Sequence, residues 1–151
     1  MDSLDSRLLN LLQTDCSLSL AELGDRVGLS ISGVKDRLRR MRARGDVRAY
    51  VALIDPRAAG YGLCAFVRVA VEGQKQERAF VAAMLKRPEV EECHRVSGEL
   101  PCLLKLWAND LGHLERLIED KIKPRAGVAR VQVSIVLSSP KDHVTGLTAR
   151  S

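Results

Sequence analysis

The 151-residue sequence predicts an α+β protein made of a winged helix-turn-helix followed by a ferredoxin-like β-α-β-β-α-β sandwich. Three observations predict this fold class. The first fifty residues show the patterns of three helices, and positive charge is concentrated in the third helix. Strand and helix patterns alternate after residue 62. We expect a helix-turn-helix domain over residues 1–50, a linker strand or loop over 51–62, a ligand-binding and oligomerisation domain over 63–140, and a tail over 141–151.

The first two helices are predicted from apolar spacing and from capping residues. A first helix, over residues 3–13, carries one apolar stripe made of Leu4, Leu8, Leu11 and Leu12. Ser19 and Glu22 have the spacing of a capping box, which begins a second helix. Gly28 ends that helix, because glycine adopts a left-handed conformation at little cost.

A third helix is predicted over residues 31–44, capped by Ser30 and closed by Gly45. At 100° per residue, one side of this helix carries four expected core residues, Ile31, Val34, Leu38 and Met41. The opposite side carries Ser32, Lys35, Asp36 and Arg39. Residues 35–48 hold an excess of five positive charges, which equals the formal net charge of the whole chain, +5.

A short helix, a turn containing glycine and a longer basic helix form a helix-turn-helix pattern. The inner side of the basic helix would pack on the first two helices, its outer side would meet base edges, and its flanks would meet phosphates. We therefore predict contact with double-stranded operator DNA. The expected DNA-binding residues are Ser30, Ser32, Lys35, Arg37, Arg39 and Arg40.

A short apolar segment over residues 47–54 is expected to form a strand that serves as a small wing. Pro56, Gly60 and Gly62 then interrupt any periodicity and indicate a linker. The G-x-G-x-x-A pattern over residues 60–65 precedes a strand instead of following one, so it does not predict a dinucleotide site.

The second domain is predicted from alternating strand and helix patterns. Strands are expected over residues 63–71, 90–96, 100–107 and 128–137, with helices over 76–86 and 111–122. Apolar residues gather on one side of each helix and alternate along the last strand: Phe80, Val81, Met84, Leu85, Leu111, Leu114, Leu117, Ile118, Ile122, Val131, Val133, Ile135 and Leu137. Two helices cover one face of such a sheet. Because the alternate set Ala65, Val67, Val69, Leu104 and Leu106 is too apolar for water, we expect it to form a homodimer contact on the other face.

Composition argues against several classes of protein. The longest uncharged stretches span ten residues, about half a membrane crossing, and the acidic N-terminus lacks the features of a signal peptide. We therefore expect a cytoplasmic protein without a membrane partner. Five aromatic residues are too few for stacking unpaired bases.

No metal site, cofactor or catalytic group is predicted. The four cysteines contain no C-x-x-C pair, and we expect reduced, half-buried thiols. The three histidines, His94, His113 and His143, lie far apart without a metal-ligand pattern and are interpreted as structural or surface residues. No nucleophile and base can be grouped from spacing, so an enzyme is not expected.

The order of these elements resembles the Lrp/AsnC family of bacterial and archaeal transcription regulators over nearly the whole chain. The resemblance is carried by Leu4-Asp5, Leu8-Leu9, Leu20-Ala21-Glu22-Leu23, Val27-Gly28-Leu29-Ser30, Val34, Arg37-Leu38-Arg39, Gly45, Val47, Asp55-Pro56, Gly60, Pro88-Glu89-Val90, Val96-Ser97-Gly98 and Gly127-Val128. It implies dimers built by contact between sheets, often assembled into octamers. It also implies a small effector, usually an amino acid, bound between C-terminal domains.

Two positions depart from the family pattern. Ile31 stands where proline often follows the capping serine. Pro101 stands where the hairpin commonly has an aspartate near the effector, and proline supplies neither a carboxylate nor a backbone donor. Glu99 would supply the charge if the loop turns it inward. The expected effector-binding residues are Ser97, Gly98, Glu99, Leu100 and Pro101.

Two other functions fit parts of the pattern. One is an architectural protein that coats DNA with little sequence specificity. The other is a tetrapyrrole-processing enzyme similar to the sirohaem decarboxylases, which resemble this family in both domains. The basic third helix argues against the enzyme, because an enzyme has no need of a face that contacts phosphates.

Overall fold

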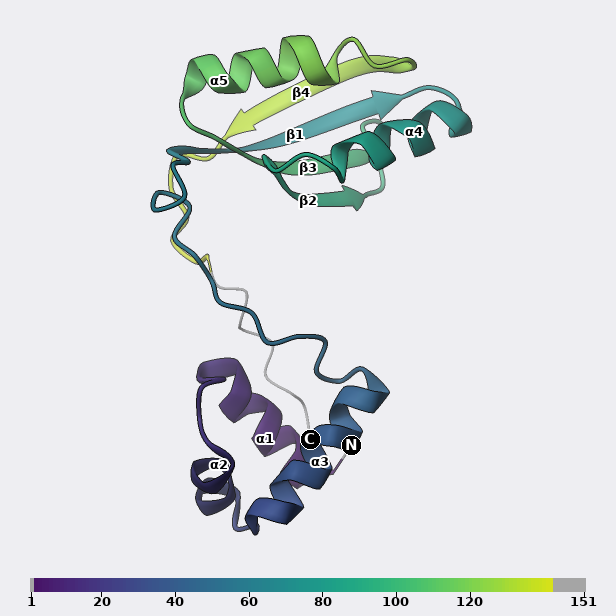
Figure 1. The fold of residues 1–151 in the computed structure, drawn as a ribbon. Helices are drawn as coiled ribbons and strands as arrows, with labels where there is room; N and C mark the ends of the chain where they lie inside the picture. Colours follow the sequence, from purple (N-terminus) through teal and green to yellow (C-terminus); the bar gives the residue numbers. More distant parts are fainter. Residues whose placement is uncertain (1, 143–151) are drawn as a thin grey trace. The chain divides into compact units, whose positions relative to one another are not determined.

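The computed structural model describes residues 2–142. They include two compact units, one with residues up to 53 and one with residues 54–140 (Figure 1). The predicted tail over 141–151 lies almost wholly outside the described residues. In the described part of the chain, no helix combines the length and the apolar character that crossing a membrane requires.

The first unit contains three helices: α1 (Ser3–Thr14), α2 (Leu20–Val27) and α3 (Ile31–Arg44). The predicted capping box of Ser19 and Glu22 is confirmed, since each side chain bonds the other residue's backbone N–H. Gly28 and Gly45 end α2 and α3, as predicted, and the left-handed conformation predicted for Gly28 is found at both. The fully buried core is made of Leu8, Leu23, Val27, Val34 and Met41.

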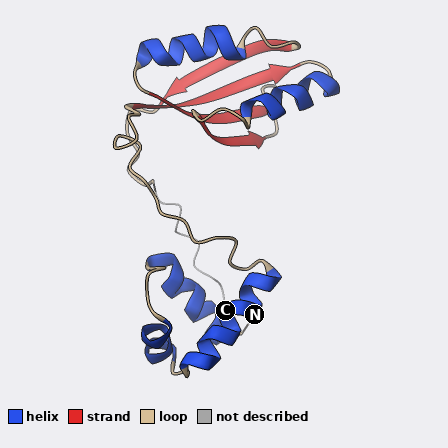
Figure 2. Ribbon diagram, in the orientation of Figure 1, coloured by secondary structure: helices blue, strands red, loops and turns tan. Residues whose placement is uncertain are grey.

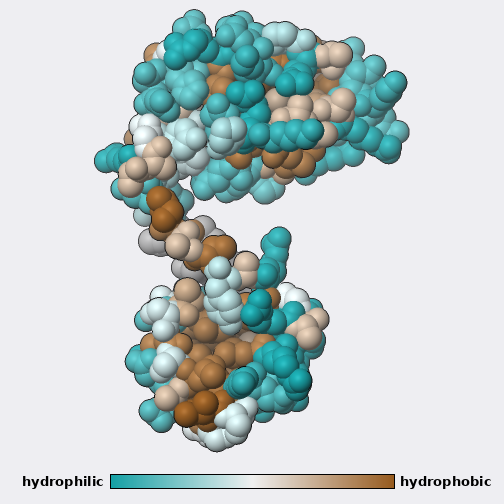
Figure 3. Space-filling view, in the orientation of Figure 1, coloured by the Kyte–Doolittle hydropathy of each residue, from teal (hydrophilic) through white to brown (hydrophobic). Residues whose placement is uncertain are grey.

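The turn between α2 and α3 depends on a close backbone approach at Gly24. A Cβ atom at this position would lie 2.5 Å from the carbonyl oxygen of Leu29, which is too close for any side chain. Position 24, where α2 comes closest to the turn, therefore requires glycine. Around the core, half-buried leucines add to the apolar surface that Figure 3 shows on the visible face of this unit.

Two predictions for the first unit are wrong. Ile31 is 56% exposed instead of belonging to the core, because it lies in the first turn of α3 and does not pack in the core cluster. Residues 47–54 form no strand within the described chain; they run as a loop in which Tyr50, Val51, Leu53 and Ile54 are exposed. A strand needs a hydrogen-bonded neighbour, and this segment pairs with none of the described strands.

The second unit contains the predicted β-α-β-β-α-β order. Its elements are β1 (Leu63–Val71), α4 (Gln74–Met84), β2 (Val90–Arg95), β3 (Cys102–Ala108), α5 (Leu111–Arg116), a π-helical continuation (Leu117–Ile122) and β4 (Val128–Ile135). The sheet is antiparallel with the order β2-β3-β1-β4. Figure 2 shows both helices of this unit packed against the sheet, and their inner residues complete one core.

Several of the apolar side chains whose spacing predicted these elements are exposed at element ends. Leu85 follows the last residue of α4, Leu111 begins α5, and Leu137 lies beyond β4; their exposed fractions are 68%, 61% and 95%. Val133 and Ile135, about 40% exposed, lie on the edge strand β4. The periodicity identified the elements, but side chains at the end of an element or on an edge strand are covered only in part by their neighbours.

The face assigned to dimerisation is also wrong. Ala65, Val67, Val69, Leu104 and Leu106 are at most 2% exposed, because the helices cover them. Alternation in a strand identifies residues that share a face, but not the face that the helices cover. The opposite, helix-free face of the central strands carries Cys64, Phe66, Arg68, Leu103, Lys105 and Trp107.

Candidate nucleic-acid interface

The exposed side of α3 brings together most of the predicted DNA-binding residues. Ser30 and Ser32 are exposed at its N-terminus, with their hydroxyl oxygens 3.1 Å apart. Ser30 Oγ also accepts a hydrogen bond from the backbone N–H of Gly33 at 3.2 Å, as the predicted cap requires. Lys35 follows on the next turn and is likewise exposed. These groups can donate to phosphate oxygens or base edges without leaving the helix surface.

Two arginines extend this cationic side toward the end of the helix. The side chains of Arg39 and Arg40 are 78% and 56% exposed, and both pair with Asp36. Such exposed pairs contribute little to stability, so DNA phosphates can compete for the arginines at small cost. Hydrogen bonding by Arg39 and the nearby positive charge lower the pKa of Asp36.

Arg37 lies apart from this set, on the flank of α3 that faces α1. Its Nη1 atom lies 2.6 Å from Oδ2 of Asp2 and 2.7 Å from Oδ1 of Asp5, and only 20% of its side chain is exposed. Arg44 reaches the same Asp5 at 3.0 Å and also pairs with Asp46. This network ties the basic helix to α1 by charge as well as by apolar packing.

Sequence reasoning missed the role of Asp5. The signal was present, because Asp5 lies three residues before Leu8, next to the buried stripe of α1, and its side chain is only 8% exposed. Burial by itself raises the pKa of Asp5, but hydrogen bonds from Arg37 and Arg44 outweigh it, so the pKa lies below its ordinary value. Asp5 is therefore a charged anchor for α3.

Replacing Asp5 with asparagine is expected to destabilise the first unit at neutral pH by about 2 kcal/mol, the typical contribution of hydrogen bonds to a charged group. Because the native pKa is lowered, the wild-type advantage is complete above the ordinary pKa of 3.8 and declines as the pH falls toward the native value. Urea unfolding followed by circular dichroism from pH 7 to pH 2.5 measures both quantities.

The exposed aspartate of α2 supplies a matched control, Asp25→Asn, which should unfold like the wild type at each pH. A stability difference between wild type and Asp5→Asn that stays constant down to pH 2.5 would contradict the role assigned to the ionised carboxylate.

The predicted effector-binding residues lie in the other unit, on the loop between β2 and β3. Ser97, Gly98 and Glu99 are exposed, whereas Leu100 and Pro101 are half-buried. Gly98 has a φ of 109°, a conformation that other residues rarely adopt. The loop closes through a hydrogen bond from the Val96 N–H to the Pro101 carbonyl at 2.8 Å, so Pro101 contributes a backbone acceptor.

The carboxylate of Glu99 turns toward the sheet. Its Oε2 atom lies 2.6 Å from Nη2 of Arg130, on β4, while 83% of its side chain stays exposed. A ligand's ammonium group would have to share the Glu99 carboxylate with Arg130 or displace Arg130 from it. Glu99 is therefore the carboxylate of this loop, and it already has a cationic partner.

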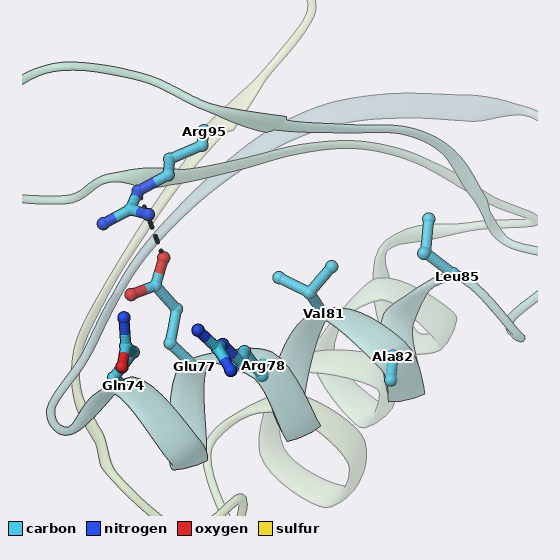
Figure 4. Close-up of a pocket in the computed structure, with 7 residues that line it drawn as sticks. All are labelled: Gln74, Glu77, Arg78, Val81, Ala82, Leu85 and Arg95. Carbon is cyan, nitrogen blue, oxygen red and sulfur yellow. Dashed lines mark ion pairs between the residues drawn. The ribbon is translucent and has the colours of Figure 1, made fainter.

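A separate hollow of about 300 Å³ lies beside α4, next to the end of β2 (Figure 4). Arg95 reaches across it to Glu77 at 3.3 Å. Its lining consists of Gln74, Glu77, Arg78, Val81, Ala82, Leu85 and Arg95 and includes none of the five loop residues. The loop and this hollow are therefore distinct surfaces.

The remaining polar candidates have local partners. His94 contacts Glu92, and Nδ1 of His113 accepts a hydrogen bond from the backbone N–H of Asn109, while His143 lies outside the described residues. Over residues 2–142, no three His, Cys, Asp or Glu side chains form a group that could hold a metal ion. Contrary to prediction, Cys16 is exposed and Cys102 is buried; only Cys64 and Cys93 are half-buried.

Comparison with known proteins assigns both units to described families. Residues 1–42 match the AsnC-type helix-turn-helix domain, and residues 64–145 match the Lrp/AsnC ligand binding domain. The chain is 32% identical over 143 residues to the leucine-responsive regulatory protein of Escherichia coli K12, covering 93% of this chain and 87% of that protein. It is 33% identical over 141 residues to an HTH-type transcriptional regulator of Pyrococcus horikoshii, covering 93% and 89%.

Two solved structures are similar to nearly the whole chain. A transcriptional regulator from Neisseria meningitidis, in complex with L-Met, superposes with a TM-score of 0.93 at 32% identity, covering 97% of this chain and 96% of that one. A feast or famine regulatory protein from M. tuberculosis, complexed with L-methionine, gives a TM-score of 0.88 at 33% identity, with coverage of 98% and 99%.

Proposed function

Because the chain belongs to the Lrp/AsnC family of DNA-binding transcriptional regulators, we propose that it reads operators through the exposed side of α3 under the control of an amino-acid effector. The observation that carries this proposal is the cationic side of α3 itself. Lys35, Arg39 and Arg40 are exposed there, whereas Val34 and Met41 anchor the other side in the core.

Within this proposal, the predicted residues have different tasks. Lys35 and Arg39 lie on the outer side of α3 and face base edges, and Arg40 faces a phosphate. Ser30 caps the helix, and it and Ser32 offer hydroxyl groups to the backbone of the DNA. Arg37 acts indirectly: its ion pairs with Asp2 and Asp5 fix the orientation of α3.

We further propose a homodimer formed through the helix-free face of the sheet. Phe66 is 38% exposed at its centre, and Leu103 and Trp107 lie beside it on β3. Trp107 Nε1 donates a hydrogen bond to Glu91 at 2.7 Å, and Nζ of Lys105 lies 5.9 Å from the centre of its ring, so Trp107 already has polar partners on this face. Such a dimer would place two copies of α3 in successive major grooves. Dimers assembling into octamers extend the same proposal.

The proposed effector is an amino acid bound near the loop over residues 97–101. Two similar regulators have been solved in complex with L-methionine. Here Glu99 supplies the carboxylate for the ligand's ammonium group, and Arg130, next to it, can take the ligand's carboxylate. A regulator working on DNA in this way acts in the cytoplasm and needs no catalytic activity.

Selection of duplexes from fragmented genomic DNA, followed by competition against random DNA at fixed salt, tests the function. We expect a preference of at least about 10³ for selected duplexes. A small preference with a steep salt dependence would indicate the architectural alternative.

The same titration, repeated with each of the twenty amino acids, should reveal one that changes operator affinity. Glu99→Gln should reduce this response without changing affinity in the absence of ligand. Glu115→Gln, an exposed glutamate on α5, is the control and should respond normally. Equal responses in both variants would exclude the loop as the effector site.

A further inference from the structure

Ile31 is a large aliphatic side chain that the core of the first unit does not use. It is the first residue of α3 and is 56% exposed, whereas Val34 and Met41, on the same helix, are fully buried. Leu38 is half-buried and packs on that core. The helix therefore gains little folding stability from an isoleucine at this position.

The surroundings of Ile31 are those of the predicted DNA-contacting surface. It lies between Ser30 and Ser32, whose hydroxyl oxygens are 3.1 Å apart, and one helical turn before Lys35. The first turn of α3 contains no acidic residue. Nothing in this turn repels a phosphate backbone, and the N-terminal residues of a recognition helix are those that contact base edges.

The chemistry of the major groove selects the partner. Base edges present hydrogen-bond donors and acceptors, and the 5-methyl group of thymine is the apolar group among them. An aliphatic side chain placed against donors and acceptors would remove water from them without replacing their hydrogen bonds. Against a methyl group, it gains from burying apolar surface on both sides.

We propose that Ile31 is a specificity-determining residue that packs against the 5-methyl group of a thymine in each operator half-site. This inference rests on the proposed function and names one base that the helix reads. It assigns sequence preference to an aliphatic contact at the start of α3, in addition to the polar contacts of Lys35 and Arg39.

Replacing thymine by deoxyuridine removes only the methyl group and tests the contact directly. The probe is a duplex selected by the wild-type protein, with each thymine of a half-site replaced in turn. At one position, wild-type affinity should fall about fourfold, the factor for one buried methyl-sized group, and roughly fifteenfold when both half-sites are changed. Ile31→Ala should bind the thymine and deoxyuridine duplexes equally at that position.

A matched control removes another exposed aliphatic side chain elsewhere. Leu85→Ala, directly after α4, should discriminate thymine from deoxyuridine as the wild type does. Melting temperatures of both variants verify folding. Equal wild-type affinity for thymine and deoxyuridine at every position overturns the proposal, as does unchanged discrimination by Ile31→Ala. If the wild type does not prefer selected over random duplexes, the proposed function fails as well.

Discussion

The double substitution Lys35→Ala and Arg39→Ala is expected to lower operator affinity at least about a hundredfold without changing the melting temperature. Both side chains are exposed on α3, and neither packs in the core of the first unit. A good base contact contributes about 1–3 kcal/mol, and a dimer loses each contact twice. The loss of the Arg39–Asp36 pair has little effect on stability, because the pair is exposed.

Fluorescence anisotropy with a selected duplex measures this loss, and titrations at several salt concentrations indicate its origin. Loss of phosphate contacts would flatten the salt dependence, whereas loss of base contacts would reduce the preference over random DNA. The control removes the same charge from α4 through Lys75→Ala and Arg78→Ala, both exposed. If the α3 variant binds the duplex as tightly as the wild type, DNA binds another surface.

The substitution Phe66→Glu is expected to produce a folded monomer and to weaken operator binding by about 10²–10⁴. Phe66 lies on the helix-free face of β1, opposite Lys105, and is 38% exposed, so a single chain tolerates a polar side chain there. In a dimer, two carboxylates would be buried near each other at the contact, which is strongly unfavourable. A monomer then loses the gain from binding two half-sites together.

Sedimentation velocity measures the assembly, and anisotropy measures the accompanying loss of DNA affinity. Leu111→Glu places the same charge at an exposed apolar residue on α5 and should leave the dimer intact. A Phe66→Glu protein that sediments like the wild type would rule out this face as the dimer contact.

Much of the fold and of the candidate interface was predictable because the relevant signals are local. The capping box at Ser19 and Glu22, the glycine at 28 and the stripe through Val34 and Met41 each depend on residues within a few turns of one another. These short-range patterns define α2 and α3, and they also leave Lys35 and Arg39 on the outer side of α3.

The tertiary structure decided the features that depend on residues far apart in the chain. Asp5 meets Arg37 and Arg44 across separations of 32 and 39 residues, so spacing alone could not pair them. The exposure of Ile31 depends on how the three helices pack, and the face of the sheet left open depends on where α4 and α5 pack. Periodicity groups residues by side, but only packing determines which side is buried.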